Sequence, residues 1–418
     1  MTFSIPGPFS MVLNTMPVRA EIYGRSGNGE VLSQEALDTA IGEISLWPGY
    51  SQTPLVELDG LAAATRVEKI FYKDESTRFG LGSFKALGGA YAVLRLLQDA
   101  VQAATGIRPD SGEFAAGAHR ARTASMTVTC ATDGNHGRSV AWGARAFGCA
   151  CVIYVHAGVS QPRRAAIAAY GAEVREVQGT YDDAVRKADS DARVNGWHVV
   201  SDTSYEGYTE IPRNVMQGYG VIAQEVQGQL PPGMRPTHVF VQGGVGGLAA
   251  SLCAWFWEAD VASAPVFVVV EPDQADCLQR SARAGAPVVA PGKLDTIMAG
   301  LACGEVSLIA WQILSHGADA FMTVADEAAA ATMRLLADGM KGDTPIVAGE
   351  SAVAGLAGAL LAAGDEKTRE ALKLNEHSVV LVIGTEGATD PELYRQIVGQ
   401  SAEEVRQRTA VCSGAAQP

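Results

Sequence analysis

The chain has 418 residues, 47% of them apolar, and a formal net charge of −14. This length fits two lobes with a shared interface, and the acidic balance excludes a general nucleic-acid surface, which needs clustered lysine and arginine. No uncharged apolar run is long enough to cross a membrane, and the first charged side chain is Arg19, so the basic start of a signal peptide is missing. Seven irregularly spaced cysteines indicate reduced thiols rather than a disulfide framework or a metal cluster. We therefore expect a soluble cytoplasmic protein that acts on a small molecule.

Strand-like and helix-like runs alternate from Phe71 onward, which predicts parallel sheets joined by helices. Residues 1–45 are polar and irregular, and residues 103–125 are expected to form an exposed helix–loop insertion. The polar tail 401–418 is expected to be frayed. The expected strands are 126–131, 150–155, 173–177, 197–202, 237–242, 266–271 and 379–383, and the expected helices between them are 138–147, 162–170 and 182–194.

A helix start at Lys85 is the first candidate functional feature. Ser83 suits the N-cap position. Three small residues share a helix face with the lysine, namely Gly88, Gly89 and Ala92. Such a face would let the helix lie close against a flat ligand. Lysine forms a Schiff base with the aldehyde of pyridoxal phosphate, although a solvated surface charge is the ordinary role of one lysine.

The loop Thr132–Gly137 lies between an expected strand and an expected helix. Backbone amides converge at a helix N-terminus, where they can hold an anion. Within this loop, Asn135 can hydrogen-bond a hydroxyl or phenolate oxygen, and Asp133 can accept a proton. The structural alternative is a tight turn that caps the helix.

Four glycines occur in the run Gln242–Ala249, which follows an expected strand. Without Cβ atoms, successive N–H groups can curl around a phosphate, with a helix dipole behind them. However, Gly244, Gly246 and Ala249 also satisfy G-x-G-x-x-A. Glu271 ends the next strand, and together these features form a dinucleotide-binding fingerprint. A flexible structural turn is a third possibility, so this run alone leaves its ligand undecided.

Three further segments place polar side chains at the ends of expected elements. Asp202, in Ser201–Tyr208, lies at the carboxyl end of a strand, where open α/β sheets place ligands. Thr385, in 384–387, can hydrogen-bond a pyridine nitrogen without protonating it. The third segment, 349–351, opens a helix of small residues. Capping and packing turns are the alternatives for all three.

Taken together, these segments resemble the fold-type II pyridoxal-phosphate enzymes, a group that includes the serine and threonine dehydratases and cysteine synthase. The Ser-x-Lys helix start, the Asn-bearing loop and the Gly-rich loop occur in the order typical of that group. The likeness runs from about residue 45 to residue 395, and within the group it is greatest to the diaminopropionate ammonia-lyases. It implies an α/β architecture of two doubly wound open-sheet domains with the cofactor in the cleft between them. The large domain would combine 1–89 with 206–400, the small domain would span 90–205, and the protein would be a homodimer.

Residue by residue, the resemblance implies that Lys85 binds the aldehyde of pyridoxal 5'-phosphate and that Asn135 contacts the ring hydroxyl. Thr385 is expected at the ring nitrogen. The phosphate would be bound by Gly243, Gly244, Val245, Gly246 and Gly247.

Asp133 distinguishes this chain from the dehydratases, which usually carry a small hydroxyl residue at this place in the Asn loop. A carboxylate suits a substrate with an ammonium group on Cβ, and the ammonia-lyases share this aspartate together with one that matches Asp202. We therefore expect α,β-elimination of 2,3-diaminopropionate to pyruvate and two ammonia. Lys85 and Asp133 would remove the α-proton from opposite enantiomers, so both the D and L forms would react. Asp202 would hold the β-amino group or adjust the protons as ammonia leaves.

Three other functions stay open at this stage: a dehydratase acting on serine or threonine, an NAD-dependent dehydrogenase, and a non-catalytic binding module. The intact Lys85, Asp133 and Asp202 argue against the module. Cys277 and Cys303 both fall in matched segments. A disulfide between them would stiffen the loop, whereas two buried thiols are favoured in a reducing compartment.

Overall fold

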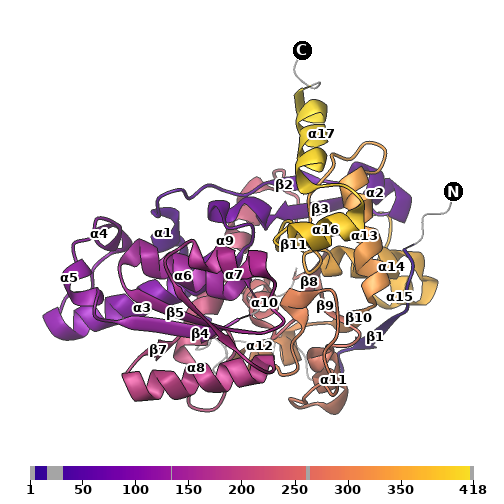
Figure 1. Cartoon of the computed structure of the whole chain (residues 1–418). Coiled ribbons are helices and arrows are strands. Elements are labelled where there is room, and N and C mark those ends of the chain that lie inside the picture. Colours follow the sequence, from indigo (N-terminus) through magenta and orange to yellow (C-terminus); the bar gives the residue numbers. More distant parts are fainter. Residues whose placement is uncertain (1–4, 17–31, 133, 260–263, 415–418) are drawn as a thin grey trace. The chain divides into compact units, whose positions relative to one another are not determined.

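The computed structural model describes residues 5–16, 32–132, 134–259 and 264–414. Its contacts divide the chain into two compact units. The first unit combines Met1–Asn28, Thr53–Thr77 and Ile222–Pro418, and the second combines Gly29–Gln52 and Arg78–Val221. Each unit contains one open sheet with helical crossovers (Figure 1). The predicted α/β class is therefore confirmed.

The predicted small domain, 90–205, begins later and ends earlier in the sequence than the main segment of the second unit, Arg78–Val221. The predicted boundary after residue 89 falls inside helix α3 (Lys85–Thr105), which packs along α6 (Asn135–Phe147) within the second unit. The second unit continues to Val221, so helix α9 (Glu210–Gln229) begins there and ends in the first unit. The division into functional domains stays a prediction.

The larger sheet belongs to the first unit and has the strand order β1-β10-β9-β8-β11-β3-β2. Its five central strands are parallel, and β1 and β2 are antiparallel edge strands. The three adjacent central strands β9, β8 and β11 are dominated by valine, isoleucine, leucine and phenylalanine, because both faces of a parallel sheet are covered. The strands are β1 (Phe9–Leu13), β2 (Leu55–Glu57), β3 (Lys69–Asp74), β8 (His238–Gln242), β9 (Val266–Pro272), β10 (Ala320–Val324) and β11 (Val379–Gly384).

Helix α14 (Ala354–Gly364) shows how small residues let a helix lie against this sheet. A Cβ on Gly355 would come within 2.6 Å of the Phe240 carbonyl oxygen, and one on Gly358 within 2.8 Å of Val270 Cγ2. Among the described residues, no helix is both long and apolar enough to cross a membrane. The other helices of this unit are α2 (Asp59–Thr65), α10 (Gly247–Ala259), α11 (Cys277–Ala284), α12 (Leu308–Gly317), α13 (Asp326–Asp338), α15 (Glu366–Ala371), α16 (Pro391–Val398) and α17 (Ala402–Gly414).

The smaller sheet belongs to the second unit and is entirely parallel, in the order β6-β5-β4-β7. Side chains alternate between the two faces of a strand. Accordingly, Val152 and Tyr154 of β5 pack against α8, whereas Ile153 points toward Gly137 of α6. The strands are β4 (Thr127–Ala131), β5 (Ala150–His156), β6 (Glu173–Val177) and β7 (His198–Val199). The remaining helices are α1 (Gln34–Ser45), α4 (Ser111–Ala115), α5 (Arg120–Thr123), α7 (Gln161–Ala168) and α8 (Tyr181–Asn195).

Several expected elements differ in extent. Strand β1 and helix α1 lie within the N-terminal residues that were expected to be irregular, and β10 was not predicted. Strand β1 forms because it pairs with β10, and the short sequence of β1 alone does not indicate this pairing. The strand expected at 197–202 is only the two-residue β7, so Asp202 lies in the loop beyond it.

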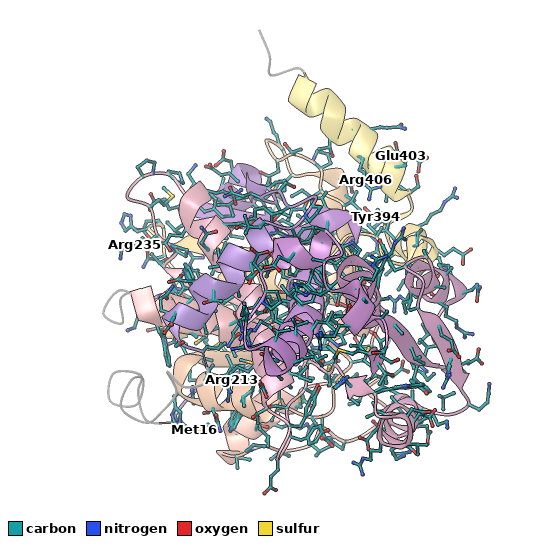
Figure 2. All side chains as sticks on the ribbon, turned by 90° about the vertical axis from the view of Figure 1, so that its left-hand side faces the viewer. Met16, Arg213, Arg235, Tyr394, Glu403 and Arg406 are labelled. Atoms are coloured by element: carbon teal, nitrogen blue, oxygen red, sulfur yellow. The ribbon has the colours of Figure 1, made fainter. Side chains whose placement is uncertain are left out.

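The tail from Ser401 was expected to be frayed, but residues Ala402–Gly414 form helix α17. Val405 is fully buried, and the Arg408 guanidinium donates to the Ala337 carbonyl oxygen at 2.7 Å. Glu403 and Arg406 lie on the exposed side of this helix (Figure 2). One buried apolar side chain and a few tertiary hydrogen bonds therefore order a segment whose composition is mostly polar.

Candidate active site

Lys85 and Asp202 form an ion pair in the second unit. The Lys85 ammonium donates to Asp202 Oδ2 at 2.7 Å, and each side chain is about one-fifth exposed (19% for both). The ammonium also lies 5.3 Å from the ring centroid of Phe84 and 5.9 Å from that of Tyr219. Burial opposes ionisation of Asp202, but Lys85 and then His136 hold the pKa of this carboxyl well below its usual range. Asp202 is therefore a carboxylate that faces the amine of Lys85.

Helix α3 begins at Lys85, and the residue before it, Phe84, makes no side-chain cap. The expected N-cap, Ser83, is instead buried and precedes the helix by one further residue. The small face of α3 serves helix packing rather than a flat ligand. A Cβ on Gly88 would come within 2.5 Å of the Tyr219 ring, and one on Gly89 would overlap the Ser139 hydroxyl. The glycines thus bring α6 and α9 close to the helix that carries Lys85.

The loop before α6 is tied down by Thr132. Its hydroxyl oxygen accepts from the N–H groups of Gly134 and Gly137, both at 3.0 Å. Two of the amides considered for an anion are therefore occupied by a capping side chain. Asn135 is the first residue of α6, and its Oδ1 accepts from Arg138 at 2.8 Å. Asp133 lies outside the described residues.

His136 lies close to Asp202. It belongs to the loop Thr132–Gly137 but was not predicted to be a functional residue. Its Nε2 lies 2.8 Å from the Val200 carbonyl oxygen, and its Nδ1 lies 3.8 Å from Asp202 Oδ2. Burial lowers the pKa of His136, as does Lys85 to a smaller extent, whereas Asp202 raises it. The sequence signal was present, because a histidine directly followed the selected Asn135.

Tyr208 closes the loop that carries Asp202. Its hydroxyl donates to the Val199 carbonyl oxygen at 2.8 Å and accepts from the Ser201 N–H at 3.0 Å. Its ring stacks on Tyr205, with centroids 4.9 Å apart. Strand β7 ends at Val199, so these side-chain bonds replace the ladder that a longer strand would have supplied. The sequence motif contained Tyr208, but nothing in the motif indicated this bond.

The Gly-rich run lies in the first unit, between β8 and the N-terminus of α10. Gly244 and Gly246 have φ angles of 61° and 97°, in the left-handed region that favours glycine. A Cβ on Gly243 would come within 2.7 Å of Glu271 Cγ. The Gly243 and Gly246 amides bond to carbonyl oxygens within the chain. The N–H groups of Gly244 and Val245 have no hydrogen-bond partner among the described residues, and Gly247 begins α10.

Thr385 lies on the same edge of the larger sheet as this run. Strands β8 and β11 are adjacent and parallel, so the residues that follow them share one edge. Thr385 is buried directly after β11. Gln242, at the end of β8, binds the Ile383 carbonyl oxygen at 2.6 Å and joins the two strand ends. The 349–351 segment is a packing turn, because a Cβ on its glycine would overlap the backbone of Gly387.

Glu271 argues against the dinucleotide fingerprint. It is fully buried, and its two oxygens accept from the N–H groups of Leu278 and Gln279 at 2.9 and 2.7 Å. Burial raises the pKa of this carboxyl to about 8. In a dinucleotide site the acidic residue must reach a ribose hydroxyl, but here it caps helix α11.

Cys277 and Cys303 both lie near Gly244, and both are thiols rather than a disulfide. The Cys277 sulfur lies 3.5 Å from the Gly244 carbonyl oxygen, and a Cβ on Gly244 would be 3.7 Å from the Cys303 sulfur. Burial raises the pKa of the Cys277 thiol well above its usual range.

Comparison with known proteins decides between the cofactors. A family model described as "Pyridoxal-phosphate dependent enzyme" matches residues 46–386. The chain belongs to this family. Family membership confirms the predicted resemblance and makes pyridoxal phosphate its cofactor, and with Glu271 engaged at α11 the NAD-dependent alternative is set aside.

Relatives of this pyridoxal-phosphate enzyme include diaminopropionate ammonia-lyases. The diaminopropionate ammonia-lyase of Escherichia coli (strain K12) is 43% identical over 362 residues, which cover 85% of this chain and 89% of the relative. That of Salmonella typhimurium is 40% identical over 369 residues, covering 85% and 90%. The solved Escherichia coli enzyme in complex with an aminoacrylate-PLP azomethine reaction intermediate aligns with a TM-score of 0.83 at 38% identity, covering 94% of this chain and 97% of that one. The same enzyme in complex with D-serine gives a TM-score of 0.84 at 37% identity, covering 95% and 99%.

The residues of the chain fit this cofactor. The Gly-rich run offers amides at a helix N-terminus, where a phosphate is favoured, and the positive φ angles of Gly244 and Gly246 require glycine at these two places. Lys85 supplies a partly buried primary amine with a carboxylate beside it, which is the group that condenses with an aldehyde.

Proposed function

We propose that the chain catalyses α,β-elimination of 2,3-diaminopropionate to pyruvate and two ammonia. The observation that carries this proposal is the Lys85–Asp202 ion pair, because it sets a carboxylate beside the amine that would act on the substrate. Relatives that are 40–43% identical and are named diaminopropionate ammonia-lyase support it. When bound, pyridoxal phosphate supplies an electron sink for the bond broken at Cα.

Lys85 is the proposed base for one enantiomer. Its amine must first lose the proton that it shares with Asp202, after which it can take the α-proton of the substrate. Asp202 is a carboxylate with a depressed pKa, so it can pair with the second ammonium group of a diamino acid, which a serine or threonine substrate lacks. That pairing favours a diamino acid over a hydroxy amino acid.

Asp133 is the proposed base for the other enantiomer, from the opposite face. Its support comes from the sequence alone, in the loop that joins β4 to α6. We propose Asn135 for the ring hydroxyl of the cofactor and Thr385 for its ring nitrogen. For the phosphate we propose the run from Gly243 through Gly244, Val245 and Gly246 to Gly247.

The test is to locate the lysine and to measure its product. Reduction of the loaded protein with borohydride fixes the cofactor to its lysine, and peptide mass spectrometry should find it on Lys85. Lys85→Ala should lose both this label and pyruvate formation from diaminopropionate. Lys187→Ala is the matched control, because Lys187 also pairs with an aspartate, Asp191, at 2.7 Å but is exposed. Label on another lysine, or pyruvate formed by Lys85→Ala, would contradict the proposal.

A serine dehydratase is the second candidate, and one observation favours it: a relative with 37% identity binds D-serine. Pyruvate release from D-serine and L-serine should therefore be measured beside release from both enantiomers of diaminopropionate. Turnover of serine faster than diaminopropionate would assign the chain to that second class.

We also propose a homodimer, which rests on the resemblance alone. Light scattering coupled to size-exclusion chromatography tests it, and a mass of about one chain, 43.7 kDa, would contradict it.

A further inference from the structure

One ring nitrogen of His136 is buried and lacks a hydrogen-bond partner in the described part of the chain. The side chain is 10% exposed, and the nitrogen concerned is Nδ1. Its other nitrogen, Nε2, faces the Val200 carbonyl oxygen at 2.8 Å. A carbonyl oxygen only accepts, so Nε2 carries the hydrogen and a neutral ring leaves a lone pair on Nδ1. That lone pair lies 3.8 Å from Asp202 Oδ2, which is itself an acceptor.

The same carboxylate oxygen, Asp202 Oδ2, faces two bases. Lys85 Nζ lies 2.7 Å from it and His136 Nδ1 lies 3.8 Å from it. At present the ammonium satisfies the carboxylate. If Lys85 becomes neutral, a largely buried carboxylate loses its cation, which is strongly unfavourable. The nearest group able to restore a positive charge is the imidazole of His136.

We propose that His136 is a positioning residue that replaces Lys85 as the cationic partner of Asp202 when Lys85 loses its proton and no substrate ammonium group is paired with Asp202. One N–H bond breaks at Lys85 Nζ, the proton passes along Asp202 Oδ2, and one N–H bond forms at His136 Nδ1. One positive and one negative charge are present before and after, and no other reactant is needed. The inference rests on the proposed function in one respect, namely that Lys85 must become a neutral amine to act.

Among the residues that the structure describes, no other group beside this pair can take up the proton and become a cation. Burial raises the pKa of the Cys130 thiol and of the Tyr208 and Tyr219 hydroxyls. All three groups therefore stay protonated and neutral, and none of them can supply a positive charge. They reach the pair from β4, from the Asp202 loop and from α9. Asp133, in the loop of His136, lies outside the described residues.

The deciding experiment measures the titration of His136 without any turnover. Full-length protein freed of cofactor is labelled with ¹⁵N-histidine, and its imidazole signals are followed by NMR against pH in wild type and in Lys85→Met. The signal of His136 is assigned by its loss in His136→Gln. In Lys85→Met the titration midpoint of His136 should move to higher pH by roughly one to three pH units, the range for an unopposed nearby charge. Adding Asp202→Asn to Lys85→Met should abolish that movement.

His238 is the matched control within the same samples. It is also buried, its Nε2 also lies against a carbonyl oxygen (Leu372, 2.9 Å), and burial lowers its pKa. Its Nδ1 lies 2.8 Å from the Thr237 hydroxyl rather than beside a carboxylate. Its midpoint should be the same in all variants. The signal of His119, in the second unit, should also be unchanged, which shows that this unit remains folded.

A second readout uses the nucleophilicity of Lys85. Cyanate carbamylates only neutral amines, so its rate at neutral pH reports how often Lys85 gives up its proton. In His136→Gln, which retains a donor toward Val200, carbamylation of Lys85 should slow severalfold relative to that of Lys187 in the same sample. A merely structural role of His136 would leave this ratio unchanged.

Two results would overturn the proposal: a His136 midpoint in Lys85→Met that stays at or below the wild-type value, or a Lys85 carbamylation ratio unaffected by His136→Gln. Neither measurement involves diaminopropionate, so a failure here is distinct from failure of the proposed function, which is judged by pyruvate release.

Discussion

Asp202 Oδ2 lies 2.7 Å from Lys85 Nζ, although 117 positions separate the two residues in the chain. The pair joins the first residue of helix α3 to the loop beyond the shortest strand of the smaller sheet. Neither partner belongs to a rigid strand, so neighbouring side chains must hold the loop in place.

Replacing Asp202 with asparagine should lower kcat/KM for diaminopropionate by about 10²- to 10⁴-fold, the range for loss of a group that handles protons. The amide keeps the shape but removes the negative charge that faces Lys85. Covalent cofactor binding should survive. Asp191→Asn, which removes a carboxylate paired at the same distance with Lys187, is the control and should change kcat/KM less than twofold. Equal effects of the two variants would contradict a special role for Asp202.

Tyr208→Phe tests whether the loop is held by one hydroxyl. The change removes the hydrogen bonds to the Val199 carbonyl oxygen and the Ser201 N–H. A backbone group left unpaired in this way costs about 1–3 kcal/mol. We expect a lower free energy of unfolding and a lower kcat, with KM changed less. Tyr205→Phe is the control, since Tyr205 stacks on the same ring but is half exposed, at 52%. A wild-type kcat in Tyr208→Phe would mean that the Tyr208 hydroxyl is not needed to position the loop that carries Asp202.

The sequence predicted both sheets because runs of β-branched residues alternate with amphipathic helices, and strand β6 was placed at its observed bounds. It did not predict β1, which pairs with a strand more than 300 residues away. The short β7 was overestimated because Val200 reads as strand-like, although the ladder ends at Val199. Whether β1 forms and where β7 ends depend on pairing with strands that are distant in the sequence, and local composition does not encode such pairing.

The candidate site follows the same pattern. Lys85 and Asp202 were both selected from their places at the ends of elements, and the structure brings them together. The contributions of His136 and Tyr208 depend on which carbonyl oxygens their side chains reach, Val200 and Val199 respectively. Those contacts arise only once the chain has folded around β7.

Gly243→Ala tests the phosphate-binding run. An added Cβ would come within 2.7 Å of Glu271 Cγ, which is held by two backbone N–H groups and has little room to move. We expect weaker cofactor binding, measured by titration of cofactor absorbance, and at least a tenfold loss of kcat/KM at limiting cofactor. Gly228→Ala is the control. It lies in helix α9 with nothing within 4 Å of its Cβ, so it should leave cofactor binding unchanged and stabilise the chain by about 0.8–1 kcal/mol.

Lys73→Met should destabilise the chain by about 3–5 kcal/mol because it leaves a buried carboxylate without its positively charged partner. Lys73 and Glu225 are both fully buried, and their charged atoms lie 2.6 Å apart. The double variant Lys73→Met/Glu225→Gln should recover much of that loss. Lys69→Met, on the same strand but at a partly exposed ion pair, should cost at most about 1 kcal/mol. Urea unfolding measures the free energy of unfolding of all three variants. Similar destabilisation by Lys73→Met and Lys69→Met would contradict the expected effect of burial on the Lys73–Glu225 pair.

His238 should make the chain less stable as the pH falls below about 6.5, the ordinary pKa of histidine. Burial lowers its pKa in the folded state. In that window the unfolded chain binds a proton that the folded chain does not, so the free energy of unfolding decreases as the pH decreases. His238→Gln, which retains a donor for the Leu372 carbonyl oxygen, should show a shallower decrease between pH 7 and pH 5.5 in urea unfolding. Parallel curves for the two proteins would contradict this.

The most direct test of the account is the product ratio from purified protein loaded with pyridoxal phosphate and given 2,3-diaminopropionate. The account predicts one pyruvate and two ammonia per substrate, faster than any release of pyruvate from serine or threonine, and lost in Lys85→Ala. If diaminopropionate yields no pyruvate while serine does, the assignment of Lys85 and Asp202 to a diamino acid is wrong.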